Sequence, residues 1–195
     1  DGSGKFIANV LNNRKITDAI HALLDRGGLI LGICNGFQAL VKSGLLPYGR
    51  LGCVGKESPT LFRNDINRHV SQIVTTRVAT VNSPWLSSFE VGELHSIAVS
   101  HGEGKFVVSD EMAEELFRNG QVAFQYVDPD GNATLRAPYN PNGSSFGIEG
   151  IISRDGHILG KMGHTERYED GLFKNIAGNK VQEIFANAVN YFKGK

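Results

Sequence analysis

Residues 29–38 read LILGICNGFQ, and this stretch decides the fold of the chain. A run of apolar residues stops at Cys34, which Gly32 and Gly36 flank, and a segment with helical character, residues 35–42, follows at once. The pattern predicts a buried strand that turns sharply into a helix, with Cys34 at the corner. The glycines fit this interpretation because a tight corner needs unusual dihedral angles and close approach of neighbouring backbone.

A cysteine at such a corner has the features of a nucleophile. Open α/β sheets place their chemistry where a strand turns into a helix, at the carboxyl end of the strand. The helix N-terminus offers free N–H groups and a positive partial charge, which stabilise a thiolate. The pKa of a free thiol is about 8.5, and such a position can lower it to roughly 3.5–7.5. An arbitrary cysteine is more often a buried structural residue, but the glycines and the strand-to-helix change favour a reactive thiol at Cys34.

The composition is that of an ordinary globular chain. Its 195 residues are 41% hydrophobic, so we expect one well-packed domain over residues 1–195. Lys plus Arg and Asp plus Glu both number 20, which favours neither a nucleic acid nor an anionic membrane as a partner. No apolar run approaches the ~20 residues that span a bilayer. Two cysteines, Cys34 and Cys53, make no disulfide framework and are typical of a reducing, cytoplasmic compartment.

The chain begins at Asp1 and opens with an expected glycine-rich turn, residues 1–4, and a helix. A doubly wound α/β domain normally begins with a strand. We therefore expect the first strand or strands of the sheet to precede Asp1.

The rest of the sequence alternates between helical and extended patterns. Apolar residues at helical spacing predict helices over residues 6–11, 16–24 and 181–192. Short β-rich segments, with turn signals at Asp130-Gly131 and Asp155-Gly156, predict strands over residues 70–81, 121–127, 133–137 and 158–162. We therefore predict an α/β fold with an open, mostly parallel sheet, helices on both faces and an antiparallel β elaboration.

His164 and Glu166 supply the two groups that a cysteine nucleophile needs. A thiolate requires a base that takes the proton and returns it to the leaving group, and a third group that orients the base. His164 follows a predicted strand and stands two residues before Glu166. Residues i and i+2 of extended backbone share a face, so Glu166 could orient the imidazole while Cys34 approaches from the other side. A His-x-Glu pair alone is a weak signal and is usually structural.

Together with GICNGFQ, this pair makes the chain resemble the class I, or triad, glutamine amidotransferases, which have a Gly-x-Cys-x-Gly-x-Gln elbow and a Cys-His-Glu triad. Within that class, the chain resembles the glutaminase domains of phosphoribosylformylglycinamidine synthases. The resemblance implies a flavodoxin-like sheet and an N-terminally truncated domain at the C-terminal end of a larger enzyme. The motifs that carry it run in family order: residues 34–36 (CNG), 62–64 (FRN), 97–104 (IAVSHGEG), 126–128 (YVD), 140–144 (NPNGS) and 164–167 (HTER).

The resemblance implies hydrolysis of L-glutamine. Cys34 would attack the side-chain amide and form a γ-glutamyl thioester, and His164, held by Glu166, would protonate the departing ammonia and then activate water. The ammonia would pass to a synthetase portion of the same enzyme, which converts formylglycinamide ribonucleotide to formylglycinamidine ribonucleotide in purine biosynthesis. ATP and Mg²⁺ are expected in that portion, and no cofactor or metal is expected in this domain.

The same resemblance implies contacts with the oxyanion or the substrate. The backbone N–H of Asn35 would be one oxyanion donor, and one such donor is worth ~2.7–4 kcal/mol of barrier. Further donors would come from a loop before Asp1, so the isolated chain is expected to be weak or inactive. The other residues implied to contact the oxyanion or substrate are Gly32, Gln38, Arg63, Asn64, His101, Asn142 and Gly143.

These residues also have plainer interpretations. Gln38 could be an amide on a helix surface, Arg63 and Asn64 could be ordinary loop residues, and residues 142–143 could form a plain turn. His101 could itself be the base, although its glycine-bounded position suits a loop that lines the pocket. The remaining histidines show no ligand spacing, so the sequence predicts no metal site.

Two other functions stay open. One is another cysteine hydrolase on the same kind of sheet, which typically lacks a late His-x-Glu pair. The other is a docking or regulatory module that kept the fold and lost turnover, against which the intact Cys34, His164 and Glu166 argue. Thr165 and Phe37 depart from the family pattern, where proline and a cysteine or small residue are common, and these changes concern backbone geometry near the site.

Overall fold

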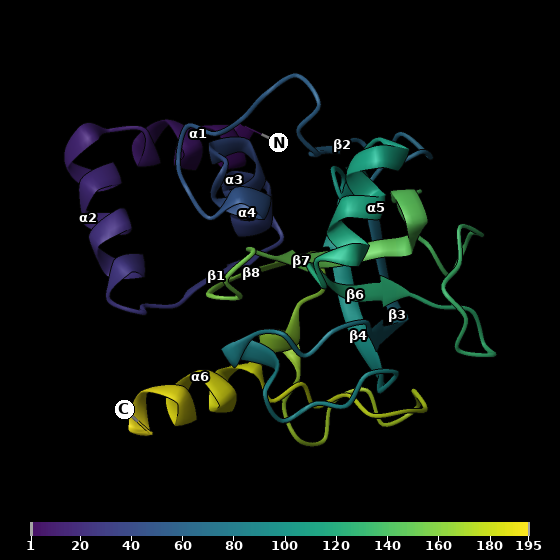
Figure 1. The fold of residues 1–195 in the computed structure, drawn as a ribbon. Helices are drawn as coiled ribbons and strands as arrows, with labels where there is room; N and C mark the ends of the chain where they lie inside the picture. The colour runs from purple at the N-terminus through teal and green to yellow at the C-terminus, as the bar shows by residue number, and fades with distance from the viewer. Residues whose placement is uncertain (1, 195) are drawn as a thin grey trace.

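The apolar patterns of the chain become helices and strands in the computed structural model, which describes residues 2–194 (Figure 1). The helices are α1 (Gly2–Leu11), α2 (Arg14–Asp25), α3 (Asn35–Ser43), α4 (Leu45–Tyr48), α5 (Asp110–Arg118) and α6 (Ile184–Lys193). The strands are β1 (Ile30–Ile33), β2 (Thr60–Phe62), β3 (Val70–Val78), β4 (Leu94–His101), β5 (Lys105–Val107), β6 (Val122–Tyr126), β7 (Ile148–Ile152) and β8 (Ile158–Lys161). Across these residues, no helix has the length and apolar character to cross a membrane.

Six of the strands form one mixed sheet in the order β1-β8-β7-β6-β3-β4, and β2 pairs with β5 in a small second sheet. The α/β class is confirmed, but the described sheet is less parallel than expected. Only β1 and β8 run parallel, and the other four neighbouring pairs are antiparallel. The reason is local in part: β7 and β8 are joined by a hairpin in which Gly156 has a φ of +76°, and a hairpin forces antiparallel pairing.

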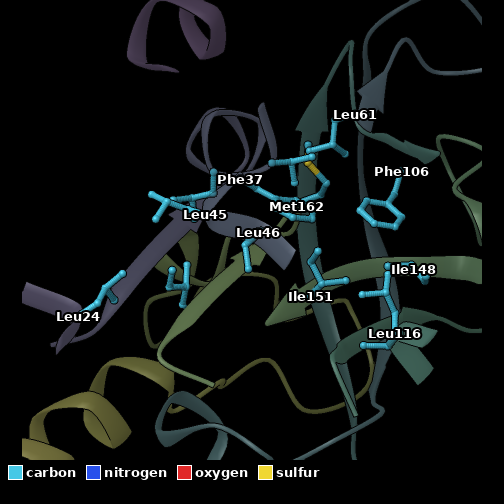
Figure 2. Packing of buried hydrophobic residues seen from close by; sticks show 14 residues of the cluster. Leu24, Phe37, Leu45, Leu46, Leu61, Phe106, Leu116, Ile148, Ile151 and Met162 are labelled. Atoms are coloured by element: carbon cyan, nitrogen blue, oxygen red, sulfur yellow. The ribbon is translucent and has the colours of Figure 1, made fainter. Parts of the chain in front are cut away.

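Helices cover both faces of the sheet, as predicted, because the central strands alternate their apolar side chains. Ile151 and Ile158 belong to the cluster that includes side chains of α3 and α4, which Figure 2 shows at close range. Their chain neighbours Ile152 and Leu159 belong to a second cluster, together with Ile184 of α6. In Figure 1, α3 and α4 accordingly lie on one side of β1 and β8, and α6 lies on the other.

The predicted segments 70–81, 121–127 and 158–162 correspond to β3, β6 and β8, but the strand predicted over residues 133–137 is absent. Ala133 forms an isolated bridge with Val127, and Leu135 is 68% exposed. Pro138 follows directly and has no N–H to donate to a strand ladder. The sequence pattern also did not single out β4, β7 or α5, of which β4 matters most for the site.

The three predicted helices at the chain ends correspond to α1, α2 and α6. One detail of the N-terminus differs from expectation: α1 begins at Gly2, so residues 2–4 are helical and do not form a glycine turn. Helix α1 packs closely on α3, since a Cβ atom on Gly4 would lie 2.9 Å from Oε1 of Gln38. Asp1 and the oxyanion loop expected before it lie outside the described residues.

Candidate active site

Cys34 is the first residue after β1 and directly precedes α3, as the sequence predicts. Its backbone has a φ of +53° and a ψ of −105°, a region that a residue with a side chain rarely adopts. Such a conformation costs about 1–3 kcal/mol and occurs most often at functional sites. Two backbone hydrogen bonds hold it: the Cys34 N–H donates to the carbonyl of Lys161 at 2.9 Å, and the Cys34 carbonyl accepts from the N–H of Gln38 at 3.1 Å.

The two glycines beside Cys34 serve different purposes. A Cβ atom on Gly32 would lie 2.5 Å from Cδ1 of Leu40 and 2.7 Å from the carbonyl carbon of Gly36, so Gly32 lets α3 pack directly on β1. A Cβ atom on Gly36 would meet no atom of the described residues within 4 Å. Gly32 is therefore a packing requirement, whereas Gly36 leaves open space on the first turn of α3.

The Cys34 thiol is partly buried against strand β4, and its Sγ lies 3.8 Å from the carbonyl oxygen of Ser100. Burial raises the pKa of the thiol, and the nearby carboxylate of Glu166 acts in the same direction. The N–H of Asn35 and the charge of Arg167 lower the pKa, but burial outweighs them. The expectation that the helix N-terminus would lower the pKa is therefore wrong for this structure, because desolvation disfavours the thiolate more than one N–H group favours it.

His164 follows β8 by three residues and is almost completely buried. Its N–H donates to the carbonyl of Ala98 at 2.8 Å, and its Nδ1 lies 2.5 Å from Oε1 of Glu166. Because a carboxylate only accepts, the imidazole proton lies on Nδ1. The other ring nitrogen, Nε2, is buried and has no hydrogen-bond partner among the described residues. The pair meets through a short 3₁₀ turn, Thr165–Arg167, rather than through the extended backbone that the sequence reasoning assumed.

The sheet brings Cys34 and His164 to the same end, the one where β1 and β8 finish. Cys34 follows β1 and His164 follows β8, and these two strands are parallel neighbours with Ile33 opposite Lys161. Both residues also contact β4, since the thiol lies against the Ser100 carbonyl and the His164 N–H bonds the carbonyl of Ala98. Carbonyls of alternate residues point to the same side of a strand and are about 7 Å apart. The thiol of Cys34 and the backbone of His164 therefore lie along the same side of β4.

The Gln38 side chain, one turn after Cys34 on α3, is buried rather than on the helix surface. Its Nε2 donates to the carbonyl of Glu103 at 2.6 Å. Gln38 therefore links helix α3 to residues 101–104, which belong to the Ser-His-Gly-Glu-Gly motif of residues 100–104.

Asn64 and Asn142 bind the same segment. The Asn64 Nδ2 donates to the carbonyl of His101 at 2.8 Å, and its Oδ1 accepts from the N–H of Gly104 at 3.1 Å. The Nδ2 of Asn142 donates to the carbonyl of Gly104 at 2.8 Å. Gly143 lies beside Asn142 with a φ of +81°, and a Cβ atom there would overlap the carboxylate of Asp65. Both side-chain amides are buried, and both form hydrogen bonds with the backbone of residues 101–104.

His101 is the last residue of β4 rather than a loop residue, and it is buried. Its Nδ1 donates to Oδ1 of Asn64 at 3.1 Å, so among the described residues an amide rather than a carboxylate orients the ring. Burial lowers the pKa of His101 from 6.5 to about 4, with the neighbouring His69 as the next cause. The ring is therefore neutral at ordinary pH, and its hydrogen bond to Asn64 holds the end of β4 in place.

Of the predicted contact residues, Arg63 lines a large cavity, and its place relative to a substrate stays a prediction. The cavity has a volume of about 680 Å³, and Lys5, Lys42 and Glu103 line it as well. Lys42 is eight residues after Cys34 on α3, which corresponds to about 12 Å along the helix. The structure thus brings Cys34, His164 and Glu166 to one end of the sheet, with Gln38, Asn64 and Asn142 as supports, and Arg63 lines a cavity that Glu103 also borders.

Several groups at this end of the sheet escaped the sequence reasoning. The carbonyls of Ala98, Ser100 and Lys161 hold the site together, and a main-chain carbonyl leaves no signal in a sequence. Within the described part of the chain, no cluster of three or more His, Cys, Asp or Glu side chains is placed to hold a metal ion.

A family model described as "CobB/CobQ-like glutamine amidotransferase domain" matches residues 1–192. The chain belongs to this family of glutamine amidotransferases. The phosphoribosylformylglycinamidine synthase subunit PurQ of Gloeobacter violaceus is 37% identical over 168 residues, which are 86% of this chain and 67% of that subunit. The PurQ subunit of Koribacter versatilis is 34% identical over 174 residues, which are 89% of this chain and 70% of that subunit.

A solved structure supports the same assignment. The structure of PurLQS from Thermotoga maritima contains a chain that matches with a TM-score of 0.67 and 28% identity, over 98% of this chain and 72% of that one. The resemblance inferred from the motifs is confirmed: the chain is a glutaminase domain of the PurQ type, from an enzyme of purine biosynthesis. It spans about two thirds of the length of the relatives it matches.

Proposed function

We propose that this domain hydrolyses glutamine through a γ-glutamyl thioester on Cys34, with His164 as the general acid and base and Glu166 as the group that orients it. The observation that supports the proposal most is the arrangement of His164. Its Nδ1 is bound to Glu166 at 2.5 Å, and its Nε2 is buried without a partner among the described residues, at the end of the sheet that also holds the thiol. An imidazole held in this way has one basic nitrogen left for the proton of a nucleophile.

The raised pKa of Cys34 defines the first step. Because burial favours the neutral thiol, the proton leaves the sulfur as the sulfur attacks, and Nε2 of His164 receives it. The negative charge that develops on the amide oxygen of glutamine lies near the N–H of Asn35, in the first turn of α3, where backbone N–H groups have no partner within the helix. The imidazolium then gives its proton to the leaving nitrogen. Ammonia departs, and the glutamyl group stays on the sulfur as a thioester.

In the second step, water is the nucleophile and the sulfur of Cys34 is the leaving group. A water molecule attacks the thioester carbonyl while Nε2 of His164 takes one of its protons. The carbon–sulfur bond breaks, glutamate leaves, and the sulfur regains a proton from the imidazolium. Glu166 stabilises the imidazolium in both steps because its carboxylate is bound to Nδ1.

We assign positioning roles to Gln38, Asn64 and Asn142. Their side-chain amides bind the backbone of residues 101–104, so they support the wall of the site rather than reach the substrate. Gly36 leaves the open space in which the glutamine side chain can approach the sulfur.

The family membership supports a role beyond hydrolysis. The relatives are named as subunits of phosphoribosylformylglycinamidine synthase, and the PurLQS structure contains a matching chain. We therefore propose that the ammonia passes to a synthetase partner that converts formylglycinamide ribonucleotide to the amidine, with ATP and Mg²⁺ bound there. The isolated chain is expected to turn over glutamine weakly.

Replacing the nucleophile in the complete enzyme tests this proposal. Cys34→Ala should abolish synthesis that depends on glutamine and leave synthesis that depends on added ammonia unchanged. Cys53→Ala is the matched control, because Cys53 is exposed and should not affect either activity. A glutamine-like diazoketone should label Cys34. If Cys34→Ala retains glutamine-dependent synthesis, the proposed mechanism is wrong, and a domain that neither hydrolyses glutamine nor is labelled by the diazoketone fits a docking module instead.

A further inference from the structure

Two opposite charges are buried in the sheet beside the candidate active site, and the mechanism above uses neither. Lys161 ends β8 and Glu149 lies in β7, and both side chains have 0% exposure. The Lys161 Nζ lies 3.8 Å from Oε1 of Glu149 and 5.2 Å from the centre of the Phe124 ring. Burying two charges is costly unless their hydrogen bonds are well placed, so the contacts of this pair need an explanation.

The contacts of the pair converge on the residues that flank His164. The Nζ of Lys161 donates to the carbonyl of Gly163 at 3.0 Å and to Oγ1 of Thr165 at 3.0 Å. Oε1 of Glu149 accepts from the N–H of Gly163 at 2.5 Å. The third proton of the ammonium goes to Oε1 of Gln182 at 2.9 Å, just before α6. All three donors of Lys161 are therefore used, and two of them hold the histidine segment.

Lys161 also contacts the other half of the site, through its backbone. Its carbonyl accepts the N–H of Cys34 at 2.9 Å. One residue thus fixes the corner that carries the thiol with its main chain and the segment that carries the imidazole with its side chain.

We propose that the buried Lys161–Glu149 pair positions His164 for reaction with Cys34, an inference that rests on the proposed function. Hydrogen bonds from a charged group are shorter and stronger than neutral ones, so the pair restrains residues 163–165 more firmly than neutral side chains would. Because the two charges compensate each other, the restraint adds no net charge beside the imidazole. Lys161 and Glu149 are positioning residues and touch no reacting atom.

The test uses the double variant Lys161→Met with Glu149→Gln in the complete enzyme. It removes both charges together, so neither is left buried without its partner, and the amide oxygen at position 149 can still accept from Gly163. We expect kcat for glutamine hydrolysis to fall about 10²-fold, because small displacements of a reacting group have effects of this size. KM for glutamine and ammonia-dependent synthesis should change little. A crystal structure of the variant should show the His164 ring displaced from Glu166.

Two further variants keep the test decisive. Asn187→Leu removes a buried amide whose Nδ2 donates to the carbonyl of Trp85, away from residues 163–165, and it should lower stability without changing kcat. Thr165→Val removes one acceptor of Lys161 without altering any charge, so it serves if the double variant does not fold. It should lower kcat with KM unchanged.

The outcomes separate this inference from the proposed function. An unchanged kcat in a folded variant overturns the positioning role, and so does a lower kcat with the His164 ring in its original place. If the unmodified enzyme does not hydrolyse glutamine, the proposed function fails, and the ring position in the variant structure still decides whether the pair holds His164.

Discussion

The amide of Cys34 donates to the carbonyl of Lys161 at 2.9 Å, and this hydrogen bond continues the parallel pairing of β1 and β8 by one residue. Ile33 lies opposite Lys161 in that pairing, so the corner at Cys34 and the segment leading to His164 start from the same point of the sheet. Register in a buried sheet is strongly specified, because a slip of one residue would turn apolar side chains to the wrong face. The relative position of thiol and histidine is therefore set by the core and not by flexible loops.

Glu166→Gln should lower kcat for glutamine hydrolysis about 10²-fold, since general acid–base catalysis contributes an effect of this order or more. The amide oxygen of the new side chain at position 166 can still accept from Nδ1 of His164, but this side chain has no charge to stabilise the imidazolium. Steady-state kinetics of the complete enzyme measure the effect. Glu169→Gln, an exposed carboxylate three residues further on, is the matched control and should leave kcat unchanged. Equal rates for the two variants would contradict a role for Glu166.

The glycines that flank Cys34 should respond in opposite ways to alanine. Gly32→Ala places a methyl group 2.7 Å from the backbone of Gly36, and it should destabilise the fold by about 1–3 kcal/mol. Gly36→Ala meets open space and should change stability little or raise it by up to about 1 kcal/mol. The methyl group at position 36 should instead raise KM for glutamine. Urea unfolding and kinetics test both, and a severe loss of stability in Gly36→Ala would show that the space is not open.

The sequence predicts the corner at Cys34 because several local signals agree there. An apolar run, flanking glycines and a helical segment all depend on neighbouring residues, and the structure shows β1, the corner and α3 in that order. The meeting of His164 with Glu166 could be predicted for a similar reason, since two residues so close in sequence need only a turn between them.

The rest of the site depends on contacts between distant segments. The pKa of Cys34 rises because the thiol is buried near β4, and no local pattern shows that burial. The amides of Asn64 and Asn142 bind residues 101–104, about 40 positions away, which spacing along the chain does not reveal. A signal did exist for the buried pair, because Glu149 and Lys161 each interrupt an apolar run, IEGII and ILGKM. A single charge within a buried strand usually has a partner.

The stability of the protein should fall between pH 6.5 and pH 4 because of His101. The pKa of its imidazole is about 4 in the folded protein, against an ordinary value of 6.5. In this window the unfolded chain therefore binds a proton that the folded chain does not, and stability decreases as the pH falls. The complete effect is worth about 3 kcal/mol. Urea unfolding at several pH values should show a shallower decrease for His101→Asn, whose amide can still donate to Asn64. Parallel curves for the two proteins would contradict the assignment.

Lys161→Met alone should destabilise the domain more than the double variant with Glu149→Gln. The single change leaves the Glu149 carboxylate buried with no ammonium beside it, and breaking a buried pair in this way costs about 3–5 kcal/mol. The double variant removes the stranded charge, so it should recover a large part of that loss. Denaturant unfolding of the unmodified protein, both single variants and the double variant gives the coupling between the two positions directly. If the losses in unfolding free energy of the two single variants simply add in the double variant, the two charges do not interact. There would then be no physical basis for treating them as one unit that positions His164.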